Sequence, residues 1–252
     1  MGAIAMDRVM EKLDRLYAAD DTAGAKRHLL YWMEEAKLAG DERAQLTIDN
    51  ELMGLCRMAG EGDASVRYAE ATAALVRKLG LENTATAATV CVNCGTVYTA
   101  VGRTEDALAQ YRMAEDLYAR LLDPVDERVG SLYNNMAACL TKLEQYRDAM
   151  ESYSKALSIM RQIPGSEPEI AITLLNIADL LRDAYGLADA CERIDDCTQH
   201  AHDLLETEGL VRDGRYAQAC AKCAPVFEYY GWFVYAKELR KRAADIYSRA
   251  KG

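Results

Sequence analysis

Residues 93–114 read NCGTVYTAVGRTEDALAQYRMA and contain the pattern that decides the fold. Small and aromatic residues recur at offsets 0, +3, +12, +16 and +19, namely at Gly95, Tyr98, Ala107, Tyr111 and Ala114. Because residues three or four positions apart lie on one face of an α-helix, the pattern predicts two helices joined near Gly102. Small side chains let the two helices approach closely, and the aromatic side chains fill the groove beside them.

The same offsets recur along the whole chain. Their first members are Leu13, Leu52, Gly95, Ala137, Ala178 and Ala224, at intervals of 39, 43, 42, 41 and 46 residues. In the second unit the offsets fall on Leu52, Leu55, Ala64, Tyr68 and Ala71, but this register places Glu51 on a core face, so a shift of one residue is the alternative there. Self-similarity of this period is typical of solenoids, in which each repeat packs against its neighbours. We therefore expect one domain over residues 1–252, with units at about 5–39, 42–79, 84–121, 125–162, 167–206 and 213–250.

Two helices in each unit make twelve, and no segment sustains the period-two alternation of a strand, so the predicted class is all-α. The expected ranges are 5–18, 22–39, 42–59, 62–79, 84–101, 104–121, 125–142, 146–162, 167–184, 187–206, 213–230 and 233–250. Two starts carry specific signals. Asp123-Pro124 is expected to cap the seventh helix, and residues 166–169 (SEPE) are expected to form a capping box at the ninth.

The units resemble tetratricopeptide repeats. The likeness is carried by residues 93–98 with Gly102, Ala107, Tyr111 and Ala114, and by residues 132–137 with Tyr146, Ala149, Tyr153 and Ala156. The interval near 42 residues is similar to the long repeats of the kinesin light chain type. The resemblance implies a right-handed α-solenoid of about six helix-turn-helix repeats, whose first helices line a concave, peptide-binding groove.

Composition narrows the class of function. The formal net charge is −10, and an acidic chain repels phosphate backbones, which disfavours nucleic-acid binding. Half of the residues are hydrophobic, which excludes wholesale disorder, yet no run approaches the roughly 18 apolar residues of a membrane span. The first residues, MGAIAM, lack the basic start and apolar block of a secretory signal. We expect a cytoplasmic protein with no membrane partner.

Asparagine recurs at one position of the repeat. Asn50, Asn93, Asn135 and Asn176 all lie at offset −2, although the chain has only six asparagines. Two positions along a helix correspond to a rotation of about 200°, so these side chains point away from the paired helix. In the resembled family this position faces the groove, where an amide can both donate to and accept from a peptide backbone. The alternative is that each asparagine bridges neighbouring helices.

Other first-helix residues that face the same way complete the predicted peptide-binding set: Thr96, Asn134, Asp179 and Lys222. The surface is mostly neutral, with hydroxyl and amide groups in the middle. Members of the family that bind chaperones grip a terminal carboxylate with Lys or Arg beside Asn. Here the candidate cations Lys142, Arg182 and Lys222 are spread over three units, so the sequence disfavours a carboxylate clamp.

Two CxxC pairs are the strongest chemical motif, and four thiolates can hold zinc. Both pairs, Cys91/Cys94 and Cys220/Cys223, occupy the −4 and −1 offsets, which are core positions of helices three units apart. We therefore expect buried, reduced thiols and no metal. No Ser, Cys or Lys nucleophile has a visible base, and no phosphate-binding loop of the GxxxxGK type occurs. The prediction is a protein with no cofactor, no catalytic residues and no enzymatic activity.

The last unit is rich in aromatic residues, with seven of the chain's 19 within residues 216–235. The plain interpretation is a bulky cap that closes the solenoid. The alternative is a self-association or partner surface through Phe227, Tyr229, Tyr230, Trp232 and Phe233, since aromatics concentrate in interface cores. The basic residues of the last helix, Arg242 among them, are interpreted as a solvated face.

These observations predict a non-catalytic scaffold that binds a peptide segment of a protein partner in its groove. A second hypothesis is a regulatory sensor, in which the bound peptide changes the pitch of the superhelix. The two differ in one measurable property, because only the sensor should compact when its ligand binds.

Overall fold

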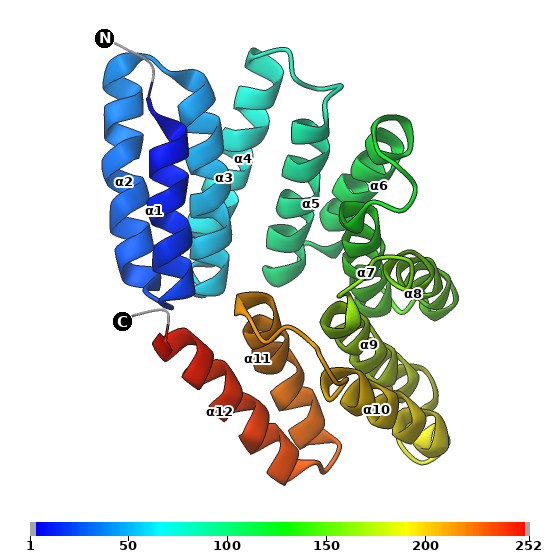
Figure 1. The fold of residues 1–252 in the computed structure, drawn as a ribbon. Helices are drawn as coiled ribbons and strands as arrows, with labels where there is room; N and C mark the ends of the chain where they lie inside the picture. The colour runs from blue at the N-terminus through cyan, green and yellow to red at the C-terminus, as the bar shows by residue number, and fades with distance from the viewer. Residues whose placement is uncertain (1–3, 250–252) are drawn as a thin grey trace. The chain divides into compact units, whose positions relative to one another are not determined.

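The structure is a computed structural model that describes residues 4–249, and this range contains twelve α-helices and no strand (Figure 1). The predicted all-α class and the predicted number of helices are confirmed. The helices are α1 (Met6–Ala18), α2 (Thr22–Ala39), α3 (Glu42–Met58), α4 (Gly62–Lys78), α5 (Ala85–Ala100), α6 (Thr104–Leu121), α7 (Glu127–Lys142), α8 (Tyr146–Met160), α9 (Glu167–Tyr185), α10 (Cys191–Leu205), α11 (Gly214–Tyr229) and α12 (Phe233–Arg249). None of the helices within the described range is both long enough and apolar enough to cross a membrane.

The helices form two compact units, which divide between Leu122 and Asp123. The first unit holds α1 to α6 and the second holds α7 to α12. Within each unit, consecutive helices pack as hairpins, and first helices of successive hairpins also touch: α3 with α5, α7 with α9, and α9 with α11. Each unit is therefore a stack of helix hairpins, which is the packing of a helical-repeat solenoid.

The turn within each hairpin contains one residue with positive φ. The φ angles are 52° at Asp20, 73° at Gly60, 80° at Gly102, 59° at Glu144, 81° at Gly186 and 88° at Gly231. Glycine dominates because it has no Cβ to oppose the left-handed conformation. These residues mark the turn of each hairpin, seven or eight positions after the first member of the repeat pattern.

The register of the second unit differs from the prediction by one residue. The positive-φ residue lies seven positions after the first member in four units, for example Gly102 after Gly95, but eight positions after it in the second and fifth units, at Gly60 and Gly186. In the second unit burial decides the register, because the buried residues of α4 lie at +12, +16 and +19 from Met53, which is therefore the equivalent of Gly95. Asn50 then lies at offset −3, rather than at the predicted −2.

Burial in α4 confirms this correction. Ser65, Ala69 and Thr72 have no exposed surface, whereas the predicted contact residue Ala71 is exposed. The two hydroxyls tolerate burial because each donates to a carbonyl of its own helix, Ser65 to Gly62 at 2.7 Å and Thr72 to Tyr68 at 2.7 Å. Sequence reasoning preferred alanine at the contact and therefore chose the neighbouring register.

The close helix contact at the start of the pattern requires glycine. A Cβ added to Gly95 would lie 2.5 Å from Cε1 of Tyr111, whose side chain is fully packed with 1% of its surface exposed. The equivalent residues Ala137, Ala178 and Ala224 are completely buried. The predicted interhelical contact between small and aromatic residues is therefore present in the core of the third repeat.

Two predicted capping signals are wrong. The cap of α7 is Asp126, which accepts from the backbone N–H of Arg128 at 2.9 Å, so the helix begins at Glu127 instead of 125. Asp123 closes a turn of its own by accepting from Val125 at 2.8 Å. Ser166 precedes α9 but makes no capping hydrogen bond, so the predicted capping box is absent.

Candidate functional site

An amide hydrogen bond connects two first helices of the first unit. Nδ2 of Asn93 on α5 donates to Oδ1 of Asn50 on α3 at 2.9 Å. Both side chains are half-buried. Asn50 also borders Glu51: burial raises the pKa of Glu51, while hydrogen bonds from Tyr17 and Asn50 oppose that rise. The Asn50 amide is thus engaged on both sides.

A matching bridge connects two first helices of the second unit. Nδ2 of Asn176 on α9 donates to Oδ1 of Asn134 on α7 at 3.2 Å, and both side chains are half-buried. Asn135 is also half-buried, and within residues 4–249 its side chain makes no hydrogen bond. The donors Asn93 and Asn176 lie at offset −2 of their repeats. With the corrected register of the second repeat, the acceptors Asn50 and Asn134 both lie at offset −3 of the preceding repeat.

The predicted ladder of asparagines at a single offset is thus two separate bridges, one in each unit. The alternative that asparagine links neighbouring helices describes Asn50, Asn93 and Asn176, together with Asn134. Asn135 alone stands outside the bridges. The register error hid this pattern, because it placed Asn50 at the same offset as Asn93.

Each bridge uses only part of the hydrogen-bonding capacity of its two asparagine side chains. A side-chain amide can donate two hydrogen bonds through its NH₂ group and accept two through its oxygen. In the second unit, the Oδ1 atom of Asn176 and the Nδ2 group of Asn134 make no hydrogen bond within residues 4–249. Both side chains are only half-buried. A peptide in extended conformation presents one N–H and one C=O per residue, which are the complementary groups.

Ion pairs and hydrogen bonds fasten the first helices of the second unit on both sides of this bridge. At their N-terminal ends, the Arg215 guanidinium of α11 lies 2.9 Å from Glu169 of α9 and 3.4 Å from Glu127 of α7. Near the other end, the Tyr230 hydroxyl donates to Oδ1 of Asp179 at 2.9 Å. The N-terminal ends of α7, α9 and α11 are therefore tied by Arg215, and the later part of α9, which carries Asn176, is also tied to Tyr230.

The other predicted site residues are placed as follows. Thr96 is half-buried and donates to the backbone carbonyl of Asn93 at 2.7 Å, which occupies its hydroxyl proton. Asp179 accepts from Arg182 at 2.7 Å as well as from Tyr230, and burial nonetheless raises its pKa. Lys222 is exposed on α11. Arg182 is neutralised by Asp179 and Asp183, which argues against its use in a carboxylate clamp.

Sequence reasoning missed one buried carboxyl group. Asp49 of α3 keeps only 8% of its surface exposed, and burial raises its pKa to about 6 despite the opposing charge of Lys37. The residue directly precedes Asn50. No repeat pattern marks Asp49, whereas Asn50 belongs to the recurring asparagines. An isolated aspartate on a helix is ordinarily exposed to solvent, so its burial could not be predicted.

The aromatic residues of the last unit divide into a core and a surface. Phe227 has no exposed surface, and its ring lies 5.0 Å from that of Tyr235 and 5.5 Å from that of Trp232. Phe227 therefore cannot belong to an interaction surface, which corrects the predicted set. By contrast, Tyr229 and Phe233 expose 61% and 67% of their surface.

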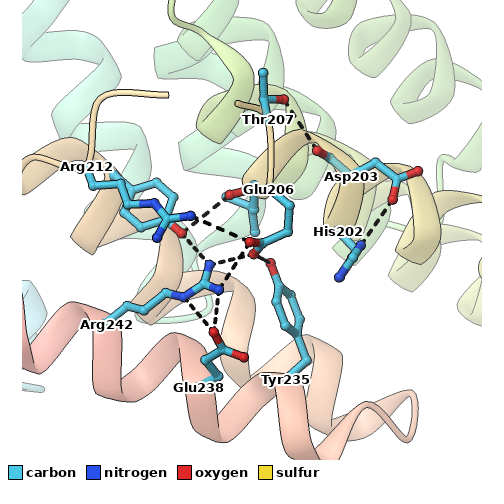
Figure 2. Close-up of polar contacts among 10 residues, drawn as sticks. His202, Asp203, Glu206, Thr207, Arg212, Tyr235, Glu238 and Arg242 are labelled. Atoms are coloured by element: carbon cyan, nitrogen blue, oxygen red, sulfur yellow. Dashed lines mark hydrogen bonds and ion pairs between the residues drawn. The ribbon is translucent and has the colours of Figure 1, made fainter. Parts of the chain in front are cut away.

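The last helix is less solvated than predicted. Figure 2 shows Arg242 and Tyr235 of α12 converging on Glu206, which follows α10. The Tyr235 hydroxyl donates to Glu206 at 2.6 Å, and Arg242 donates to Glu206 at 3.1 Å and to the Tyr216 hydroxyl at 2.7 Å. Only 17% of the Arg242 side chain is exposed. Burial opposes ionisation of Glu206, but the donors outweigh it and lower its pKa.

The cysteines of the CxxC pairs are buried, as predicted. Cys94 and Cys223 expose 2% and 1% of their surface, and burial raises the pKa of Cys94 to about 12. A buried thiol with a raised pKa holds little reactive thiolate at neutral pH. Across residues 4–249 no cluster of three or more His, Cys, Asp or Glu side chains is arranged to hold a metal ion.

A sequence profile of the tetratricopeptide repeat matches residues 128–190, which span α7, α8 and α9. BtubC (BKLC) from P. vanneervenii has a similar fold, with a TM-score of 0.56, 17% identity, and coverage of 95% of this chain and 92% of that one. A Podosopora anserina putative kinesin light chain with TPR-like repeats has a TM-score of 0.55 and 14% identity, covering 82% of this chain and 97% of that one.

A Rap protein complexed with competence and sporulation factor has a TM-score of 0.61 and 11% identity. That similarity covers 96% of this chain but 64% of the Rap chain. No curated protein has a matching sequence. At such low identity these structures show the fold alone. Together with the repeat profile, which matches one part of the chain, they support a tetratricopeptide-repeat fold.

Proposed function

We propose that this chain is a non-catalytic protein-interaction scaffold that binds a peptide segment of a partner on the first helices of its second unit. The observation that carries the proposal is the bridge between Asn176 and Asn134, which leaves a carbonyl and an NH₂ group available beside Asn135. Thr96, Asn50 and Asn93 form the corresponding surface of the first unit, and Asp179 and Lys222 flank the site in the second. Cytoplasmic location remains a prediction.

Two structural neighbours support the peptide as the class of ligand. The Rap protein was solved with competence and sporulation factor, and NprR, with a TM-score of 0.61 and 15% identity, was solved with its cognate peptide NprX. This chain covers 65% of NprR, so the wider activity of that protein is no guide here. The polar groups of the proposed site are amides, hydroxyls and paired charges, which suit recognition better than bond cleavage.

We expect the triple variant Asn134→Ala, Asn135→Ala and Asn176→Ala to weaken peptide binding about 10- to 1000-fold, because each lost hydrogen bond costs about 0.5–1.5 kcal/mol. The peptides would be selected from a random display library with the full chain, and their affinities measured by calorimetry. The single variant Asn135→Ala is the cleanest test, because it breaks no interhelical bridge. Asn176→Ala should also lower the free energy of unfolding by about 0.5–1.5 kcal/mol.

Asn83→Ala provides the matched control, since Asn83 is exposed in the turn before α5. Selected peptides should bind this variant as tightly as the wild type. Failure to select any peptide, or equal binding to the triple variant, would contradict the proposal. Small-angle scattering with and without a selected peptide then tests the alternative of a peptide-responsive sensor, because a scaffold should keep its radius of gyration and a sensor should compact.

We also propose that the exposed aromatic residues of the last unit associate with a second copy of the chain. Tyr229, Phe233 and Val234 expose 61%, 67% and 84% of their surface, and residues 230–235 line a shallow pocket of about 480 Å³ with Glu238. Soluble monomers rarely expose large contiguous apolar patches. Tyr230 and Trp232 would support this surface from beneath, because both are half-buried.

Sedimentation velocity tests this second proposal. The wild type should sediment as a dimer at micromolar concentration, and Phe233→Ser should shift the dissociation constant upward by about tenfold or more, because large aromatic side chains dominate interface energies. Leu38→Ser is the control, as Leu38 of α2 is 71% exposed and lies in the other unit. A wild type that remains monomeric at all accessible concentrations would reject self-association.

A further inference from the structure

A second pocket lies between α1 and α2, on helices that take no part in the proposed peptide site. Its volume is about 510 Å³, which is within the range of small-molecule sites. Residues one helical turn apart line it from both helices, Arg8 and Lys12 from α1, and Arg27 and Tyr31 from α2. Faces of two helices thus line one open surface pocket.

The charged groups of this pocket are mainly cationic. Arg8, Lys12 and Arg27 are exposed, and none of them forms an ion pair within the described part of the chain. The one carboxylate in the lining, that of Asp21, accepts from the backbone N–H of Gly24 at 2.8 Å and caps α2. With three cations and one carboxylate in its lining, the pocket carries a local excess of positive charge in a chain that has 40 acidic and 30 basic residues.

All three cations line the same pocket, so an anion bound there would lie close to each of them. Their exposure to solvent means that salt screens this attraction. The surrounding chain is acidic, so the attraction is local to this pocket.

Aromatic rings form the other part of the lining. The Tyr31 and Trp32 rings meet edge to face with centroids 5.3 Å apart, and Tyr31 exposes 60% of its surface. His28 lies next to Trp32 and is held by a 3.0 Å hydrogen bond from its Nε2 to the backbone carbonyl of Val9 on α1. The exposed ring of Tyr31 can stack on a planar group, and the His28 bond holds α1 against α2.

We propose that this pocket binds a small aromatic anion, in which a phosphate or carboxylate is joined to a planar ring. The anionic group meets Arg8, Lys12 and Arg27, and the ring stacks on Tyr31. Phenyl phosphate is the minimal probe of this chemistry, and AMP is the probe for a nucleotide source of it. The proposal is independent of the peptide site, because no residue is shared between the two.

Calorimetry with the full chain and fluorescence of Trp32 in a Trp232→Phe background test the pocket. Phenyl phosphate or AMP should bind and change the Trp32 emission, and Arg27→Glu should weaken binding by about tenfold or more, because it replaces attraction by repulsion at short range. Arg112→Glu is the matched control: Arg112 is an exposed arginine of α6 outside the pocket, and its replacement should leave affinity unchanged. If AMP binds more tightly than phenyl phosphate, the ligand is assigned as a nucleotide. If phenyl phosphate binds more tightly than AMP, the ligand is assigned as a simpler aryl anion.

Tyr31→Ala separates the two halves of the proposal. It should weaken the binding of phenyl phosphate while leaving the weak binding of inorganic phosphate unchanged, and the helical circular dichroism of the variant should match that of the wild type. No binding of either aromatic probe at millimolar concentration would overturn the proposal. Equal affinities of Arg27→Glu and Arg112→Glu would overturn it as well, and inorganic phosphate binding as tightly as phenyl phosphate would overturn the role of the ring.

Discussion

Replacement of Phe227 by alanine is expected to lower the free energy of unfolding by about 3–5 kcal/mol, the usual cost of removing a buried phenylalanine. Phe227 has no exposed surface, and its ring meets that of Tyr235 edge to face and lies 5.5 Å from that of Trp232. The cavity left behind would be bounded by these rings, and the hydrogen bond from Tyr235 to Glu206 opposes collapse of the Tyr235 ring into it. Urea unfolding followed by circular dichroism measures the loss.

The chain contains one other phenylalanine, which serves as an internal control. Phe233 exposes 67% of its surface, so Phe233→Ala should change the free energy of unfolding by less than about 0.5 kcal/mol, measured at a concentration where the chain is monomeric. Similar losses for the two variants would mean that the aromatic cluster does not form the core of the last repeat.

Asp49→Asn is expected to raise the free energy of unfolding by about 1–3 kcal/mol at pH 7.5, since the buried carboxylate costs roughly 1.4 kcal/mol per unit of raised pKa. Burial raises the pKa of Asp49 to about 6, and the nearby charge of Lys37 only partly offsets this. Asparagine has nearly the same shape as the protonated acid, so it keeps the packing of α3 and removes the charge. Thermal or urea unfolding at pH 7.5 measures the gain.

The effect of Asp49→Asn on the free energy of unfolding should depend on pH. The pKa of an unfolded aspartate is about 3.9, so between about pH 4 and pH 6 the folded state holds a proton that the unfolded state has released. The contribution of Asp49 to stability therefore falls as the pH rises through this window and is constant above it. The gain of Asp49→Asn should shrink as the pH is lowered towards 4. A gain that is independent of pH, or one equalled by Asp116→Asn on the exposed face of α6, would contradict it.

The sequence predicted the elements of the fold well because the pattern that defines them is local. The spacing of small residues within a single helix identifies the face of that helix that packs. Most predicted helix bounds lie within two residues of the observed ones. The errors have tertiary or capping causes. α10 begins at Cys191 instead of 187 because residues 187–190 form a turn after Gly186, which leaves α9 with a positive φ of 81°.

The register of the second repeat could not be chosen from residue types alone. Ser65 and Thr72 look like surface residues, and the neighbouring alanines look like the contact. Their burial is possible because each hydroxyl finds a carbonyl acceptor one turn earlier on α4. The same misplacement concealed the common geometry of the two asparagine bridges, since an offset of one residue rotates a helical side chain by about 100°.

The sequence by itself determined the class of this protein: an all-α chain of repeated helix hairpins, with cysteines in the core and asparagines beside one another on successive first helices. These properties follow from periodicity, which every helix carries within its own residues. Only the tertiary structure decided which charged and aromatic groups meet. Phe227 is buried and Phe233 is exposed, and Asp49 is shielded from water. Arg242 is paired, whereas Arg8, Lys12 and Arg27 form no ion pair with any residue from 4 to 249. Each of these depends on what a neighbouring helix places opposite the side chain, and helical periodicity does not encode that choice.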